Sequence, residues 1–157
     1  MSATILLEFV SLFFAGILAG VEIVIHYGLR APAATLDERA QLALRRALVF
    51  RLRVLVPAFF VPAALAAIAV TVVDGGARGF ACRGAALAAI AVWTATRVIG
   101  TVGINSATIE WQPSAPPANW RALVDRAERF HIVGVWAAVA AYALLLTAVA
   151  LRLTTPT

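Results

Sequence analysis

Lysine is absent from this sequence, cysteine occurs once, and charged residues account for only 13% of the 157 positions. A soluble domain has about 25% charged and roughly 45–50% apolar residues, whereas apolar residues make up 62% of this chain. The lone cysteine, Cys82, excludes an intrachain disulfide and a site built from several thiolates of one chain. The composition therefore excludes a soluble globular domain.

What the sequence has instead is a set of four long apolar runs. Each reaches the length of about 20 residues that a helix needs to cross the hydrocarbon core of a membrane. Their blocks of alanine, leucine and valine lack the period-two alternation of barrel strands. We predict an all-α fold, an integral membrane four-helix bundle that forms a single domain over residues 1–157. The predicted helices span about residues 3–28, 36–73, 83–111 and 119–153.

Local signals mark the ends of these helices. Thr35 and Glu38 stand three residues apart and predict a capping box at the start of the second helix, after a connector that contains Pro32. Asn119 is predicted to cap the fourth helix. The first run lacks a basic n-region and contains two glutamates, so we interpret it as a mature helix and not as a cleavable signal peptide.

The distribution of arginine predicts the orientation. Nine arginines lie in or beside the first and third helix connections, and three lie on the opposite side. Cytoplasmic loops carry the excess of basic residues, so we expect a multi-pass protein of the bacterial inner membrane with both termini on the non-cytoplasmic side. Arginines beside apolar runs fit lipid headgroups better than nucleic acid, which we do not expect as a partner. The nine are Arg30, Arg39, Arg45, Arg46, Arg51, Arg53, Arg121, Arg126 and Arg129.

Ionisable side chains inside a membrane helix are costly, and they are kept where they are paired or used. At 100° per residue, every ionisable group of the first helix falls on one stripe, and polar stripes also occur in the third and fourth helices. The polar side chains on these stripes can pair with one another only if the stripes face each other inside the bundle. We expect them to meet in the cytoplasmic half of the membrane. They consist of Glu8, Ala15, Ala19, Glu22 and His26, then Thr94, Arg97, Thr101, Asn105 and Thr108, then His131, Val135, Ala138 and Tyr142.

Each of these residues also has a purely structural interpretation. Arg97 and Glu22 would form a buried ion pair that fixes packing, and Asn105 would form hydrogen bonds between helices. Glu8 is expected to be solvated near the outer surface. Glu128 is expected to belong to a solvated, ion-paired helix start.

The residue types suit proton abstraction from a hydrophobic carbon acid. His26 beside Glu22 makes a general base with an orienting partner. Arg97 stabilises an oxyanion or enolate, Asn105 holds a carbonyl, and His131 completes the five candidate catalytic residues. Trp111 and Trp120 are either substrate contacts or interfacial anchors. The candidate substrate-binding residues are Trp93, Thr101, Trp111, Trp120, Tyr142 and Arg53.

We predict no cofactor, with a metal ion as the alternative. Glu22, His26 and His131 would form a two-histidine-one-carboxylate metal site if they converged. The signal is weak, because Glu22-x-x-x-His26 is unspecific and we predict no site with the Glu-x-x-His spacing of di-iron bundles in this chain.

Two segments are distinctive. The first is Gly20-Val-Glu-Ile-Val-Ile-His26-Tyr27-Gly28-Leu-Arg30-Ala-Pro32. The second runs from Ile104-Asn105-Ser-Ala-Thr-Ile-Glu110-Trp111-Gln-Pro113 through Pro117-Ala-Asn-Trp120 to Arg126-Ala-Glu128-Arg129-Phe-His131. Together they resemble the anthrone oxygenase-like family of small four-helix membrane proteins. The chain departs from that family at Ala127 and Gly134, where relatives often carry tryptophan and arginine.

The resemblance implies oxygen-dependent, cofactor-free oxidation of an anthrone-type polyketide to a quinone. His26, oriented by Glu22, would take the proton from the activated methylene, and Arg97 and Asn105 would hold the resulting anion. The implied partners are a hydrophobic aromatic molecule, dioxygen and the lipid bilayer, and a homo-oligomer is compatible with the sequence.

Three kinds of function compete. The first is the membrane oxidoreductase. The second is a non-enzymatic bundle that binds lipid or quinone or serves as a subunit of a larger complex, for which the polar cluster would be internally paired without a cavity. The third is a proton or solute carrier, which needs a polar path through both membrane halves, whereas the outer half offers only Glu8.

Overall fold

The computed structural model describes residues 3–74 and 79–154, and within them the chain is helical apart from short connections. Its four long helical units, Ala3–Ala34, Glu38–Val73, Phe80–Glu110 and Trp120–Leu153, are each long and apolar enough to cross a membrane. The all-α fold and the four predicted spans are therefore confirmed. The elements are α1 (Ala3–Ile23), η1 (Val24–Leu29), α2 (Arg30–Ala34), α3 (Glu38–Val73), α4 (Phe80–Thr96), η2 (Arg97–Thr101), α5 (Val102–Glu110) and α6 (Trp120–Leu153).

The first two helices differ in detail from the prediction. The segment expected as a connector is helical: α2 follows η1 directly and contains Pro32, and the helical unit ends at Ala34. The capping box is wrong: Asp37 caps α3, and its Oδ1 accepts a hydrogen bond from the Ala40 N–H at 2.9 Å. Thr35 instead donates to the Pro32 carbonyl at 2.8 Å. At the start of α6, Asn119 is the N-cap residue but makes no side-chain capping bond.

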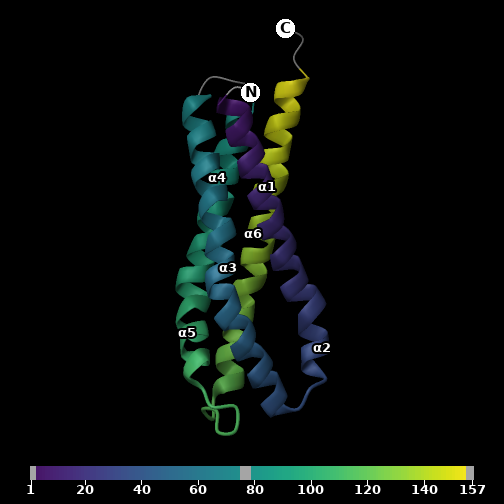
Figure 1. The fold of residues 1–157 in the computed structure, drawn as a ribbon, viewed down its shortest axis with the longest axis vertical. Coiled ribbons are helices and arrows are strands. Elements are labelled where there is room, and N and C mark those ends of the chain that lie inside the picture. Colours follow the sequence, from purple (N-terminus) through teal and green to yellow (C-terminus); the bar gives the residue numbers. More distant parts are fainter. Residues whose placement is uncertain (1–2, 75–78, 155–157) are drawn as a thin grey trace.

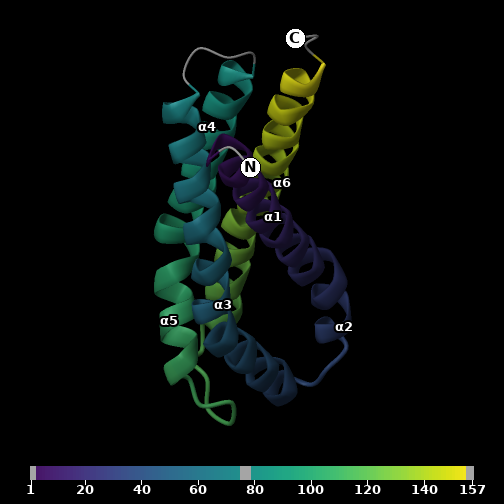
Figure 2. The same cartoon turned by 45° about the horizontal axis from the view of Figure 1, so that its top comes forward.

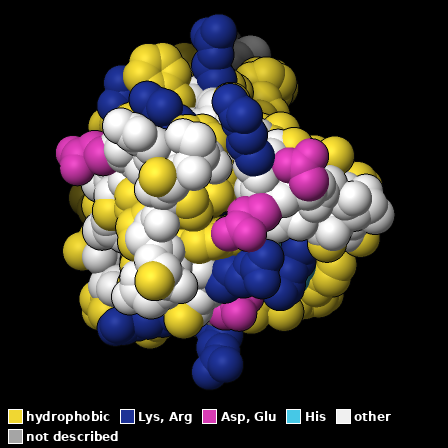
Figure 3. All heavy atoms as spheres, turned by 90° about the horizontal axis from the view of Figure 1, so that it is seen from below, with side chains coloured by type: hydrophobic (Ala, Val, Ile, Leu, Met, Phe, Trp, Pro, Cys, Tyr) yellow, Lys and Arg dark blue, Asp and Glu magenta, His cyan; other side chains and the backbone are white. Residues whose placement is uncertain are grey.

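The four helical units run side by side, and both ends of the chain lie at the same end of the bundle (Figure 1). We call this the termini end. The opposite end carries α2, the start of α3, α5 and the start of α6, and we call it the arginine-rich end (Figure 1). There, α1, α2 and the first part of α3 lean away from α5 (Figure 2). Seen end-on, arginine side chains surround this end, with acidic side chains between them (Figure 3).

Large apolar side chains cover the outside of the bundle. Phe9 is 62% exposed, Leu65 62% and Val72 75%, which in water would be a large unfavourable surface. Inside, small residues such as Ala63, Ala67 and Ala86 let the helices approach closely. This outward apolar surface is consistent with contact to a lipid bilayer.

Gly100 in η2 marks the closest approach of η2 to α6. A methyl group added there would lie 2.0 Å from Cγ of Phe130 and 2.3 Å from its Cβ. We expect Gly100→Ala to lower the free energy of unfolding by about 1–3 kcal/mol, the usual cost of overpacking. Gly103→Ala is the matched control, because nothing lies within 4 Å of its added methyl group. Unfolding in detergent micelles measures both variants, and equal losses would contradict this packing.

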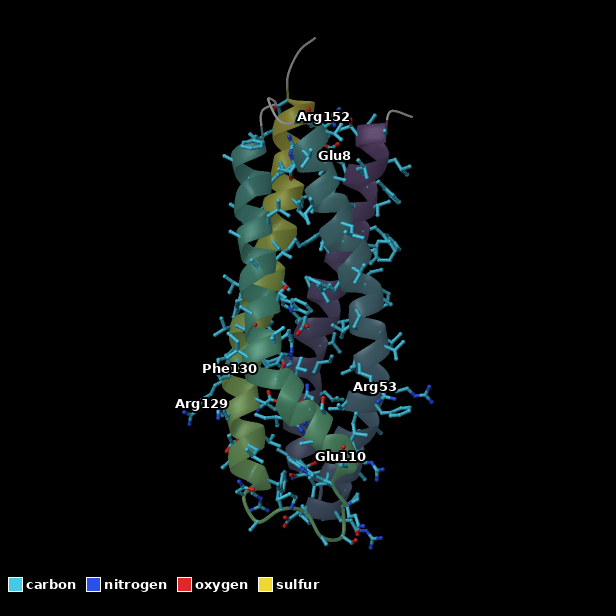
Figure 4. The ribbon with its side chains drawn as sticks, turned by 90° about the vertical axis from the view of Figure 1, so that its left-hand side faces the viewer. Glu8, Arg53, Glu110, Arg129, Phe130 and Arg152 are labelled. Atoms are coloured by element: carbon cyan, nitrogen blue, oxygen red, sulfur yellow. The ribbon has the colours of Figure 1, made fainter. Side chains whose placement is uncertain are left out.

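A buried charge network closes the termini end, where Glu8 and Arg152 lie (Figure 4). Glu8 is only 8% exposed, and its carboxylate lies 2.8 Å from Arg152 and 3.7 Å from Arg83. Arg83 in turn lies 3.1 Å from the Asp74 carboxylate. The expectation of a solvated Glu8 is wrong, because α4 and α6 bring two arginines to it. A core cluster of buried apolar residues includes Ala15, which lies between Glu8 and Glu22 on α1. The other members are Ala63, Ala67, Ala86 and Leu145.

Candidate functional site

The site is positioned by two π-helical segments that the sequence did not reveal. His26 lies in η1, and Arg97 is the first residue of η2. A π-turn inserts a residue into a helix, changes which side chains face the interior, and recurs at functional sites. Both segments belong to the half of the bundle that ends in the arginine-rich end (Figure 1).

Glu22 is the centre of the polar cluster. It is 1% exposed, and three donors from two other helical units converge on its carboxylate. Trp93 Nε1 donates to Oε1 at 3.1 Å, while His131 Nε2, at 2.8 Å, and the Arg97 guanidinium contact Oε2. Gly134 packs beside this cluster: a methyl group on it would lie 3.0 Å from Oγ1 of Thr96 and in ordinary contact, at 3.7 Å, with Nε of Arg97. The imidazole partner of Glu22 is therefore His131, where the sequence predicted His26.

A second carboxylate, Glu128, joins the two histidines. Its Oε2 lies 3.6 Å from Nδ1 of His131 and 3.7 Å from Nδ1 of His26. Its Oε1 lies 3.5 Å from Nη1 of Arg45. The side chain of Glu128 is 21% exposed, so the expectation of a solvated helix start is wrong for this residue. Glu22, His131, Glu128 and His26 form one continuous row of alternating carboxylates and imidazoles, which we call the Glu–His row.

Arg45 links this row to the third helical unit. Its Nη2 donates to Oδ1 of Asn105 at 3.1 Å. The Asn105 carbonyl is thus engaged by a guanidinium, and its amide group remains available as a donor. Arg45 and Arg97 consequently place two cations beside the two carboxylates of the Glu–His row.

A cavity of about 980 Å³ lies against this cluster. Its wall is largely apolar and includes Phe60, whose ring stacks on Trp93 with centroids 4.6 Å apart. Exposed Arg121 and Asp125 also line it, so the cavity reaches the surface at the arginine-rich end. The predicted site residues that line it are Glu22, Arg53, Trp93, Arg97, Thr101, Asn105, Trp120 and His131.

Three predicted site residues are not among the residues that line the cavity in the described part of the chain. His26 lies behind Glu128 and His131, and Trp111 caps the end of α5. Tyr142 packs in the apolar core, where its ring would touch a methyl group on Gly16 at 3.1 Å.

Three lining residues have other contacts. Arg53 points away from the bundle (Figure 4), and its guanidinium lies 4.3 Å from the centre of the Phe50 ring. Trp120 donates from Nε1 to Glu38 at 2.6 Å, which ties the start of α6 to the start of α3. Thr101 donates to the Arg97 carbonyl at 3.1 Å.

Sequence reasoning missed Glu128 and Arg45, and for Glu128 a signal was present. Glu128-Arg129-Phe130-His131 has the Glu-x-x-His spacing of metal sites in helical bundles, and residues three apart share a helix face. Within residues 3–74 and 79–154, the group that could hold an ion is His26, Glu128 and His131. The predicted set had Glu22 in place of Glu128.

Comparison with models of protein families, with curated proteins and with solved structures gives no match. The resemblance to the anthrone oxygenase-like family thus stays a prediction based on the two segments quoted above. The fold and site define a class, namely a bundle of four membrane-length helices with a charged, aromatic-walled cavity at one end.

Proposed function

We propose that this chain is a membrane-embedded oxidoreductase that oxidises a hydrophobic aromatic molecule with dioxygen inside the cavity. The substrate class is a flat, weakly acidic carbon acid of the anthrone type, which carries an activated methylene beside a conjugated carbonyl. The single observation that carries the proposal is the cavity of about 980 Å³ that brings Glu22, Glu128 and His131 to an otherwise apolar wall. A volume of this size suits a molecule of several fused rings.

The row of alternating groups supplies the proton acceptor. One methylene proton passes to Nδ1 of His131, whose Nε2 is held by the Glu22 carboxylate at 2.8 Å. Arg97, together with Arg45 and Asn105, stabilises the enolate oxygen that develops as the proton leaves. In the overall reaction the methylene loses two hydrogens and gains one oxygen atom from dioxygen. The second oxygen atom leaves as water, so atoms and electrons balance.

The proposed setting follows from the arginines. With the arginine-rich end in the cytoplasm, the protein is a multi-pass protein of the bacterial inner membrane, and both termini lie outside. The cavity then opens at the level of the inner leaflet, where an apolar substrate partitions and where Trp93 and Phe60 offer a stacking surface.

A non-enzymatic lipid- or quinone-binding bundle is the second candidate. The observation that favours it is the pairing of Glu22, whose carboxylate is engaged by Trp93, Arg97 and His131. The same cavity would then hold a stable ligand without chemistry. Turnover separates the two candidates, since a binding protein retains the molecule and consumes no oxygen.

The test uses the purified full chain in lipid nanodiscs with a hydroxylated anthrone as the probe. We expect oxygen consumption and appearance of the quinone above the rate of spontaneous oxidation. Leu52→Trp, which fills the cavity, is expected to raise KM or lower kcat/KM about tenfold or more, a loss of at least about 1.4 kcal/mol. A rate equal to the empty-nanodisc rate, with the probe still bound, would refute the oxidase and favour the binding protein.

The matched control is Val54→Trp on the same helix. Val54 is 66% exposed on the outside of the bundle, so its replacement adds the same side chain without filling the cavity. We expect kcat/KM within about twofold of the wild type. Equal losses in the two variants would show that the cavity is not the substrate site.

A further inference from the structure

We propose that His26, Glu128 and His131 bind one divalent transition-metal ion at the wall of the cavity. These residues come from η1 and α6, and their ligand atoms lie within 4.8 Å of one another. Two imidazoles and one carboxylate leave positions open on a metal ion for a further ligand. Glu128 and His131 line the cavity, so such an open position would face it.

The spacing of the three donors fits an ion better than direct contact. The two Nδ1 atoms lie 3.7 and 3.6 Å from Oε2 of Glu128, which is too long for a hydrogen bond. Two donors bound to one ion at about 2.0–2.2 Å, with roughly 110° between them, lie about 3.3–3.6 Å apart. The two N–O separations of 3.6 and 3.7 Å lie close to this range.

His26 provides an independent sign. Its Nδ1 is buried and has no hydrogen-bond partner among the described residues. A buried nitrogen without a partner is costly, and this one is directed at the shared oxygen of Glu128. A metal ion would satisfy it.

The outer contacts of the cluster match those of metal sites. Metal-bound histidines usually donate their second ring N–H to a carboxylate, which fixes the tautomer. His131 does so here: its Nε2 faces Glu22 at 2.8 Å, which leaves the lone pair of Nδ1 for an ion. Glu128 is held in the same way, since Arg45 contacts Oε1 at 3.5 Å and leaves Oε2 between the histidines.

The donor set selects the class of metal. Two imidazole nitrogens and one carboxylate oxygen suit iron(II), manganese(II), cobalt(II) or zinc, whereas magnesium and calcium prefer oxygen donors alone. The site does not depend on the proposed oxidation, but it would give iron(II) a place beside the substrate cavity.

The experiment measures metal binding on substrate-free protein that carries an affinity tag without histidine. The full chain in detergent is stripped with a chelator and titrated anaerobically with cobalt(II), whose visible absorption bands report coordination, and with iron(II) by metal analysis. We expect about one ion per chain. His26→Ala and Glu128→Gln are expected to weaken binding about 100-fold or more, and Glu22→Gln about 10–100-fold through His131.

Arg129→Gln is the matched control, because it also removes one charge, follows Glu128 directly in the sequence, and changes an exposed side chain on the outside of the bundle (Figure 4). It should bind cobalt(II) like the wild type. Far-UV circular dichroism shows whether each variant is folded. If His26→Ala unfolds, Glu128→Gln still tests the site, because glutamine keeps the shape of the glutamate side chain. Less than about 0.1 ion per chain in folded wild type, or equal affinity in folded Glu128→Gln, would overturn the site.

The metal-binding experiment and the oxidation experiment can fail independently of each other. Oxidation of the probe by protein that binds no metal would overturn the metal site and leave the oxidase standing. Metal binding that depends on Glu128, without any oxidation, would support the site and count against the oxidase.

Discussion

Replacing Glu22 by alanine is expected to lower the free energy of unfolding by about 3–5 kcal/mol, the cost of removing one partner from a buried ion pair. The variant leaves the Arg97 guanidinium and His131 without their shared carboxylate, inside a span where water is scarce. Trp93 loses the acceptor for its ring N–H in the same step. Denaturant or SDS titration of the purified chain, followed by circular dichroism, measures the loss.

A second substitution distinguishes the pairing from loss of packing. In Glu22→Ala/Arg97→Met the unpaired cation is gone, so we expect the double variant to be more stable than Glu22→Ala by about 1 kcal/mol or more. Glu110→Ala is the control, because Glu110 lines the same cavity but is exposed; its effect should be within about 0.5 kcal/mol. A double variant less stable than either single variant would show that Arg97 is held by contacts other than Glu22.

The fold could be predicted from the sequence because the length and hydropathy of the four apolar runs are sufficient to identify four membrane-length helices. The inward stripe of the first helix is confirmed as well: Glu8, Ala15, Ala19, Glu22 and His26 are all buried. A helical wheel suffices for this result, since burial follows the face of a helix. The two π-segments were not predicted, because the sequence patterns used here assume 3.6 residues per turn throughout a helix.

Which side chains contact one another in the site depends on how far neighbouring helices are shifted along the bundle axis. The residue pattern of a single helix does not give this shift. The sequence grouped Glu22 with His26 because they are four residues apart, but the heights of α1 and α6 bring His131 to Glu22 instead. For Glu128 the pattern was sufficient, since it shares a face with His131. We interpreted Glu128 as solvated because the charged first turns of a helix are usually exposed to solvent. Arg45 belongs to a similar amphipathic stretch, and its contact with Glu128 joins α3 to α6, which the pattern of a single helix does not show.

The two charge networks differ in their surroundings. At the termini end, Glu8, Asp74, Arg83 and Arg152 form ion pairs with one another. At the arginine-rich end, Glu22, Arg45, Arg97, Glu128 and His131 line a cavity of about 980 Å³. A network that only joins helices needs no adjoining space, so the second network is the one to test for chemistry.

His131→Ala is expected to reduce kcat of the proposed oxidation by about 10²–10⁴-fold, the usual contribution of a positioned proton-transfer group. His131 contacts both carboxylates of the Glu–His row, so its loss interrupts the row whether it carries a proton or holds an ion. KM should change less than about threefold, because Phe60 and Trp93 still form the aromatic wall. Steady-state oxygen consumption with the anthrone probe measures both constants.

Added imidazole should restore part of the kcat of His131→Ala, because the hole left by the ring opens into the cavity and the two carboxylates remain. The control is Ile132→Ala, the next residue on α6, which is 37% exposed on the outside of the bundle; it should keep wild-type kcat and KM. If His131→Ala is folded and retains wild-type kcat, neither the proton route through the Glu–His row nor a reaction at His131 can stand. If Ile132→Ala loses as much activity as His131→Ala, the loss comes from α6 packing and not from the imidazole.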